Sequence, residues 1–171
     1  GVTGILIGAA VSESRRRTGA LARNRTELEA DRATAAAQKE IELNHARAQE
    51  IAGVGSYRWD SATGEVWWSD QFYRLLGIEP GAFAPTSESF HDFVHPEDRG
   101  RMERLVEDIR AGRTPGTANI VRVIRKDGEP RWFKLAREVE RGPDGAPRRI
   151  FGVVQDITDE YKTSQALRES R

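Results

Sequence analysis

The chain has 171 residues and equal numbers of acidic and basic side chains, 27 of each, so its formal net charge is zero. This balance excludes a global field that would attract nucleic acid or an anionic surface. The absence of cysteine excludes disulfide bonds, thiolate metal sites and a cysteine nucleophile. Basic residues are interleaved with acidic ones and form no patch around aromatic side chains, so no nucleic-acid partner is predicted.

The composition divides the chain into two parts. The first fifty residues are rich in Ala, Arg, Glu and Gln and contain no Pro, whereas every Trp, Tyr and Phe lies after Gly55. Side chains that can build a core are therefore confined to the last two-thirds of the sequence, which is long enough for one compact core. The composition predicts one globular domain preceded by an extended segment.

Residues 1–11 are uncharged and mostly apolar, and three arginines follow at 15–17. Eleven residues are too few to cross a bilayer, which needs about 20. Arginines are typical of the cytoplasmic side of a membrane segment. We therefore interpret residues 1–11 as the end of a transmembrane segment or as a disordered terminus. The first interpretation predicts a membrane tether before Arg15, a parent protein anchored in the inner membrane and a cytoplasmic location for the rest of the chain.

Residues 12–52 are dominated by strong helix formers, with Gly19 as the one interruption. Small and apolar residues recur there with alternating spacings of four and three, which is the heptad pattern of a coiled coil. Asn44 lies at a core position, where a polar side chain can fix register and favour two strands. We predict a helical coiled-coil linker that forms a homodimer, with a solvated single helix as the alternative. The seam consists of Ala30, Thr34, Ala37, Ile41, Asn44, Ala48 and Ile51.

The remaining sequence predicts an α+β domain. Residues 55–61 and 65–69 read as a hairpin, and three further strands are expected at 117–125, 131–140 and 148–156. Short helices are expected in the sequence between the hairpin and the three later strands. Separate runs of strands and helices along the chain are typical of the α+β class. Thr86 and Ser89 have the spacing of a capping box, which predicts a short helix ending before His95-Pro96.

The last predicted strand carries apolar residues on both faces. Ile150 and Val154 point to one face of the sheet, whereas Phe151 and Val153 point to the other. A strand of this kind is covered on both faces. Short helices can cover one face, and we expect the N-terminal helix or a second subunit to cover the other.

Several landmarks between Gly55 and Thr158 resemble a PAS domain of the subtype with an HPED segment and a final Asp-Ile-Thr triplet. They are Trp59-Asp60, Trp67-Trp68-Ser69, Leu75-Leu76-Gly77, His95-Pro96-Glu97-Asp98, Arg125-Lys126-Asp127-Gly128 and Asp156-Ile157-Thr158. The resemblance implies a five-stranded antiparallel sheet with short helices on one face, over residues 53–158. It also implies an exit helix over 159–171 that leads to an output domain.

Asp156, Ile157 and Thr158 resemble the PAS output motif, in which the aspartate joins the last strand to the exit helix. The resemblance implies that Asp156 pairs with a basic residue, for which Arg131 and Arg137 are both candidates. A charge pair at a strand–helix joint can act as a switch. The alternative is a simple helix cap without a signalling role.

Apolar residues of the predicted helices could line a small cavity, although such residues more often fill a core. The candidates are Phe72, Leu76, Phe83, Phe90, Phe93, Met102, Leu105 and Ile109, together with Gln155 on the last strand. No cofactor is predicted. The resemblance implies that a flavin photosensor would need a cysteine and that a haem sensor would need a histidine in residues 97–111, and neither is present. No metal site is predicted, because Pro96 distorts the turn that holds His91 and His95.

We therefore expect a sensory and dimerisation module that is not itself an enzyme. Its flanking helices would transmit a signal to the output domain of the same parent chain, most plausibly a sensor histidine kinase. Two alternatives stay open: a receptor domain for a small ligand or cofactor, and a dimer spacer in a diguanylate cyclase or phosphodiesterase.

Overall fold

The computed structural model describes residues 1–113, 116 and 118–170. The predicted strand start at Thr117 and the last residue of the predicted exit helix, Arg171, lie outside these ranges. The chain divides into two compact units, Gly1–His45 and Ala46–Arg171. The elements in order are α1 (Val2–Ala52), β1 (Val54–Asp60), β2 (Val66–Trp68), α2 (Asp70–Leu75), the 3₁₀ turn η1 (His91–Phe93), α3 (Pro96–Arg110), β3 (Ala118–Ile124), β4 (Pro130–Arg141), β5 (Pro147–Asp156) and α4 (Thr158–Glu169).

Helix α1 is continuous over 51 residues and has no buried residue. It includes residues 2–11, so this stretch is helical in the structure, and its interpretation as the end of a transmembrane segment or as a disordered terminus stays a prediction. Local interactions stabilise it: strong helix formers prevail, and Arg17 pairs with Glu13 at 2.7 Å across one turn. Within the described ranges, no helix combines the length and the apolar character needed to cross a membrane.

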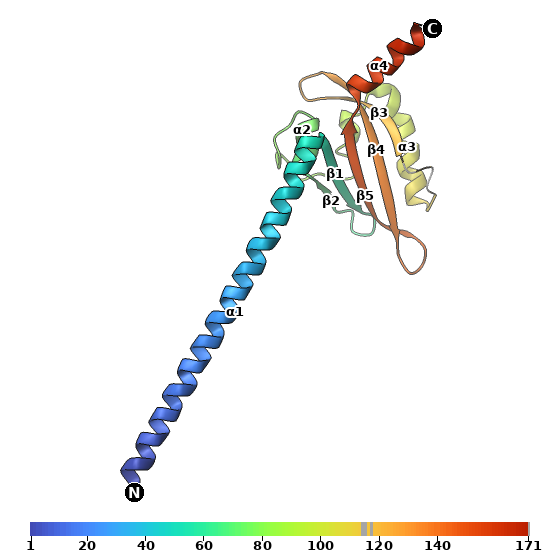
Figure 1. The fold of residues 1–171 in the computed structure, drawn as a ribbon. Helices are drawn as coiled ribbons and strands as arrows, with labels where there is room; N and C mark the ends of the chain where they lie inside the picture. The colour runs from blue at the N-terminus through green and yellow to red at the C-terminus, as the bar shows by residue number, and fades with distance from the viewer. Residues whose placement is uncertain (114–115, 117, 171) are drawn as a thin grey trace. The chain divides into compact units, whose positions relative to one another are not determined.

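The five strands form one antiparallel sheet in the order β2-β1-β5-β4-β3 (Figure 1). The hairpins β1–β2, β3–β4 and β4–β5 connect sequence neighbours, whereas β1 pairs with β5 near the end of the domain. Helices α2 and α3 contribute to a core on one face of this sheet. The predicted α+β class and the PAS fold with a long preceding helix are confirmed.

The inner face of the sheet supplies most of the core. Alternation along β3, β4 and β5 places Val123, Phe133 and Val154 on this face, and all three are fully buried. Ser69 fixes the helix above them, since its hydroxyl accepts hydrogen bonds from the amides of Phe72 at 3.3 Å and Ser56 at 2.9 Å. One side chain thus caps α2 and ties it to β1.

Gly152 allows an aromatic ring to lie flat on the inner face. The glycine pairs in register with Tyr57 on β1, and a Cβ atom at position 152 would overlap the tyrosine ring. A larger residue would therefore expel Tyr57 from its place on the sheet.

The prediction of a helix between Thr86 and His95 is wrong, because this stretch forms turns and the single 3₁₀ turn η1. The Thr86 and Ser89 side chains do interact, and the Ser89 hydroxyl accepts a hydrogen bond from the Thr86 amide at 2.8 Å. Without Glu or Gln at the fourth position, the motif closes one turn and does not start an α-helix. Helix α3 then begins at Pro96, with His95 accepting from the Glu97 amide.

The outer face of the sheet carries exposed apolar side chains. Trp67, Phe151 and Val153 are between 42% and 46% exposed. Apolar residues occupy both faces of β5, as the sequence indicated, and the expected cover over the outer face stays a prediction.

Candidate functional site

Asp156 and Thr158 form a compact joint between β5 and α4. One carboxylate oxygen of Asp156 accepts hydrogen bonds from the Thr158 amide, at 3.0 Å, and from the Thr158 hydroxyl. The other oxygen pairs with a guanidinium nitrogen of Arg131 at 3.4 Å. Because Thr158 is the first residue of α4, Asp156 holds one of the amides that a helix start leaves without an intrahelical partner.

Trp132 of β4 fastens the same joint from the neighbouring strand. Its amide donates to the Thr158 hydroxyl at 3.0 Å, and its carbonyl accepts from the Ile157 amide at 2.8 Å. Its ring stacks on Tyr161 of α4, with centroids 3.8 Å apart. The first turn of α4 is therefore attached to β4 by two hydrogen bonds and one aromatic stack.

A second charged cluster lies beyond Trp132. Arg122 of β3 places its guanidinium 5.5 Å from the Trp132 ring centre and forms ion pairs with Asp98 at 2.8 Å and Glu97 at 2.9 Å. The hydrogen bonds from Arg122 lower the pKa of Asp98 to about 2. A continuous set of contacts thus runs from the start of α3 through Arg122 and Trp132 to Tyr161.

The two candidate partners of Asp156 are separated by the structure. Arg131 is in contact with Asp156 and also with Glu129, at 2.9 Å, which helps to raise its pKa. Arg137 lies elsewhere on β4, opposite Gly152, and its guanidinium donates to Asn119. Of the two arginines that the sequence left as candidates, Arg131 is the one in contact with Asp156. Arg137 lines the cavity described below.

A cavity of about 110 Å³ lies between the inner face of the sheet and the helices. Five predicted residues line it: Phe72, Phe90, Met102, Leu105 and Ile109. The sequence did not single out its polar wall, which includes Tyr57, Asn119 and Arg137. The sequence signal for Arg137 was the alternation along its strand. This charged residue shares a face with Phe133, Leu135 and Val139, and that face is otherwise apolar.

The other four predicted lining residues lie outside this cavity. Leu76 is fully buried in the core and Phe93 packs against that core. Phe83 is 37% exposed and contacts Trp68 edge-on, with ring centres 5.7 Å apart. Gln155 is exposed and lies on the outer face of β5, so its place in the pocket prediction is corrected.

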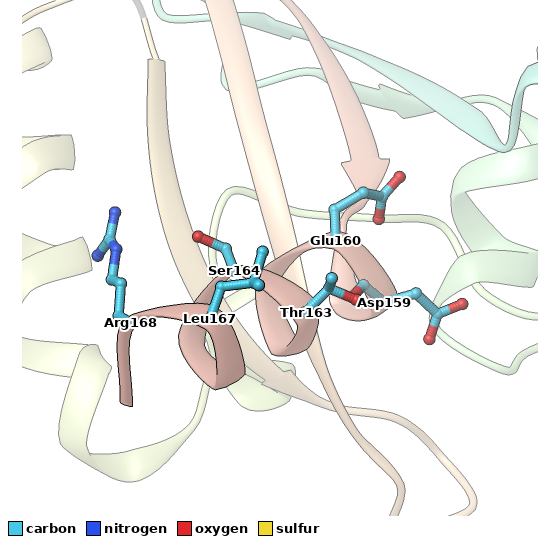
Figure 2. Close-up of a pocket in the computed structure, with 6 residues that line it drawn as sticks. All are labelled: Asp159, Glu160, Thr163, Ser164, Leu167 and Arg168. Atoms are coloured by element: carbon cyan, nitrogen blue, oxygen red, sulfur yellow. The ribbon is translucent and has the colours of Figure 1, made fainter. Parts of the chain in front are cut away.

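Helix α4 carries a wide open hollow of about 770 Å³ along its surface (Figure 2). Six residues of this one helix line it: Asp159, Glu160, Thr163, Ser164, Leu167 and Arg168. Figure 2 shows their side chains spread along the outside of the helix. Leu167 is 64% exposed, so this surface is suited to packing against another helix more than to enclosing a small molecule.

The predicted seam residues of α1, Ala37, Ile41, Asn44, Ala48 and Ile51, are all exposed. The histidines of the disfavoured metal site have other contacts: His91 Nε2 lies 2.8 Å from Glu103, and His95 caps α3. Among the residues that the structure describes, no group of three His, Asp or Glu side chains is placed to hold a metal ion.

The sheet order, the helices on one face and the strand–helix joint define an α+β sensory domain. A family model described as PAS fold matches residues 65–154. The chain therefore belongs to the PAS family, and its role is in sensory signalling.

Several known proteins that resemble the chain are named as signalling proteins. It is 31% identical over 117 residues to the Sensor protein FixL of Bradyrhizobium diazoefficiens, covering 68% of this chain and 23% of that protein. It is 28% identical over 120 residues to the Probable diguanylate cyclase DgcE of Escherichia coli K12, covering 70% of this chain and 11% of that protein. A Sensory Box Histidine Kinase/Response Regulator structure from Burkholderia thailandensis is 27% identical, with a TM-score of 0.60 over 72% of this chain and 92% of that one. The chain thus spans less than a quarter of the two curated relatives.

Proposed function

We propose that this PAS domain transmits a signal from helix α1 to helix α4 through two neighbouring strands. The observation that best supports this proposal is a pairing in the sheet. Val54, at the start of β1, lies opposite Gln155, next to the end of β5. Only Gly53 separates α1 from β1, and only Ile157 separates β5 from α4. A rotation or shift of the last turn of α1 therefore acts on the strand that carries α4.

The Asp156 joint is suited to the second step. Its carboxylate joins Arg131 of β4 to the first residue of α4, and both contacts are partly exposed to solvent. The Arg131–Asp156 pair is long, at 3.4 Å, and Arg131 has a second acidic partner in Glu129, so a small change in strand position can exchange one partner for another. A weak, exchangeable joint suits a switch.

The input in this proposal is a homodimer of α1. The helix exposes Ile41 at 52% and Ile51 at 89%, together with smaller seam residues. An Ala-rich seam packs weakly, so the two helices could exchange one register for another at low cost. Residues 1–11 would continue this helix toward a membrane anchor of the parent protein.

The output would be a domain of the same parent chain, for which we favour a sensor histidine kinase. Its relatives include FixL and a protein named as a blue-light-activated histidine kinase from Brucella anthropi. The similarity to DgcE makes a spacer in a diguanylate cyclase the competing proposal. Autophosphorylation of the full parent protein with ATP would support a kinase, whereas formation of a cyclic dinucleotide from GTP would overturn it.

The transmission step can be measured on the chain itself. Because the natural sequence has no cysteine, a single Leu167→Cys change gives one spin-label site per protomer on α4. In an α1-linked dimer, we expect Asp156→Ala to broaden or shift the label–label distance distribution measured by pulsed electron spin resonance. Glu160→Ala, in the same first turn of α4, is the matched control and should leave the distribution unchanged. An unchanged distribution in both variants would overturn the proposed role of Asp156.

A second candidate function, a receptor for a small ligand, is favoured by the cavity beneath the sheet. Its lining combines apolar side chains with the buried cation Arg137, which is unusual for a core that only needs to be filled.

A further inference from the structure

One end of the cavity is polar and is built from residues of strands β1, β3 and β4. Arg137 of β4 is only 8% exposed, and its guanidinium donates hydrogen bonds to the Asn119 side-chain oxygen at 2.6 Å and the Gly116 carbonyl at 3.3 Å. Within the described part of the chain, no aspartate or glutamate lines the cavity. The lining therefore brings a positive charge into a small, mostly apolar space.

Tyr57 supplies a second donor at this end. Gly152 pairs with Tyr57 on one side and with Arg137 on the other, so both side chains flank the glycine on the inner face of the sheet. Among the described residues, the Tyr57 hydroxyl makes no hydrogen bond, although it lies at the cavity wall. Burial raises the pKa of Tyr57 to about 12, against a smaller lowering by Arg137. The hydroxyl is therefore protonated at neutral pH and can donate a hydrogen bond.

We infer that the cavity binds a short-chain monocarboxylate, with its carboxylate between Arg137 and the Tyr57 hydroxyl and its alkyl tail toward Ile109. A carboxylate is a stronger acceptor for a guanidinium than the neutral amide oxygen of Asn119. It can therefore take the place of Asn119 at the guanidinium and gain a second bond from the tyrosine. The tail would meet Phe72, Leu105, Ile109, Leu135 and Ile150.

The volume decides the size class of the ligand. A dry cavity of about 150 Å³ accommodates benzene, which has six non-hydrogen atoms, so a cavity of about 110 Å³ suits a ligand of roughly four to five non-hydrogen atoms. Propionate has this size. Cofactor sites measure about 300–1,000 Å³, so a flavin or a haem would not fit without expansion.

A route from solvent adjoins the cavity. An open surface pocket of about 590 Å³ shares five lining residues with it: Thr86, Ser87, Phe90, Met102 and Val106. The outer pocket also carries Glu88, Asp92, Glu103 and Glu107, which outnumber the cation of Arg110 in the same lining and oppose an approaching anion. Glu88 and Glu103 are exposed and therefore screened by salt, with a Debye length of about 8 Å at physiological ionic strength. Higher salt should accordingly speed the binding of a carboxylate.

The test is a calorimetric titration of the chain with sodium propionate, with sodium chloride balancing the ionic strength. Propionamide has the same shape without the charge and is the matched control ligand. We expect saturable binding of one propionate per chain at millimolar concentrations and at least about tenfold weaker binding of propionamide. Equal binding of the two ligands, or binding of neither, would overturn the inference.

Two variants locate the site. Arg137→Gln should weaken propionate binding at least about tenfold, and Tyr57→Phe about threefold to tenfold. Their controls are Arg149→Gln, which changes an arginine outside the cavity, and Tyr73→Phe, whose hydroxyl donates to the Phe83 carbonyl and does not line the cavity. Far-ultraviolet circular dichroism checks that each variant is folded.

If Arg137→Gln does not fold, Tyr57→Phe alone decides the question, since it removes one hydroxyl and retains the ring. Unaltered propionate affinity in Tyr57→Phe, or equal losses in the variants and their controls, would contradict this site. The inference goes beyond signal transmission and does not depend on it, because ligand binding is measured without any output domain.

Discussion

Residues 1–45, all of which the structure describes, form a helix with no buried side chain, whereas residues 46–170 enclose a core in which Leu76, Val94 and Phe133 are fully buried. The first unit is held by backbone hydrogen bonds and local ion pairs, which are weak when exposed. The second is held by apolar burial at about 25 cal/mol per Å². The difference teaches that apolar packing stabilises the second unit, whereas local contacts alone stabilise the first within a single chain, and we predict that a partner helix adds to them.

The sharpest test of this contrast compares two phenylalanines on opposite faces of the sheet. Phe133→Ala removes a fully buried ring and should lower the free energy of unfolding by about 3–5 kcal/mol. Phe151→Ala removes a ring that is 42% exposed and should cost less than about 1 kcal/mol in the isolated chain. Urea titration followed by tryptophan fluorescence measures both, and equal losses would contradict the placement of the core on one face.

The charged cluster at α3 should make the stability of the domain depend on pH. The folded-state pKa of Asp98, about 2, lies below its ordinary value of 3.8, so its ion pair with Arg122 stabilises the domain above about pH 4. This contribution, about 2 kcal/mol, should be lost as the pH falls toward 2. Asp98→Asn should therefore be less stable than the natural chain at pH 7 and nearly equal to it near pH 2. Asp92→Asn is the control, and a constant difference at every pH would contradict this account.

The predicted dimerisation of α1 can be tested by substituting two residues of nearly equal exposure, one inside the predicted seam and one outside it. Ile41 is 52% exposed and lies in the predicted seam, whereas Leu43 is 50% exposed and lies outside it. We expect Ile41→Asp to weaken dimerisation at least about tenfold, or about 1.4 kcal/mol, and Leu43→Asp to leave it nearly unchanged. Sedimentation equilibrium measures both constants. A monomeric natural chain, or equal effects of the two changes, would contradict the seam.

The smallest expected effect concerns the attachment of α4. Tyr161→Leu keeps an apolar side chain but loses the stack on Trp132, which should cost about 1 kcal/mol. Hydrogen exchange of the α4 amides should accelerate about fivefold, while the strands stay protected. Leu167→Ala, at a residue that is 64% exposed, is the control. Unchanged exchange in Tyr161→Leu would show that the stack does not hold the helix.

The fold was predictable because the local turn signals agree with the alternation of apolar residues along the strands. Alternation along β5 assigned Ile150 and Val154 to one face, which the structure buries, and Phe151 to the other, and Asp127-Gly128 marked the hairpin between β3 and β4. The helix expected after Thr86 failed because the capping motif was incomplete. Its other apolar signals, Phe90 and Phe93, pack against the core from turns.

The site was predictable only in part, because pairing across strands sets it. Asp156 could be singled out from its motif, but choosing between Arg131 and Arg137 required the register of β4 against β5. The role of Trp132 could not be read from a single strand, since its partners come from β3 and α4. The polar end of the cavity likewise depends on residues of three strands, β1, β3 and β4.

Met102 is the one methionine in the sequence, and it lies on the wall shared by the cavity and the outer pocket. A single methyl isotope label at this residue would therefore give one resonance in a methyl spectrum, with no assignment step. Its chemical shift would report occupancy of the interior directly, while relaxation of the same signal would report how often the wall moves. Any compound library could be screened against that one peak.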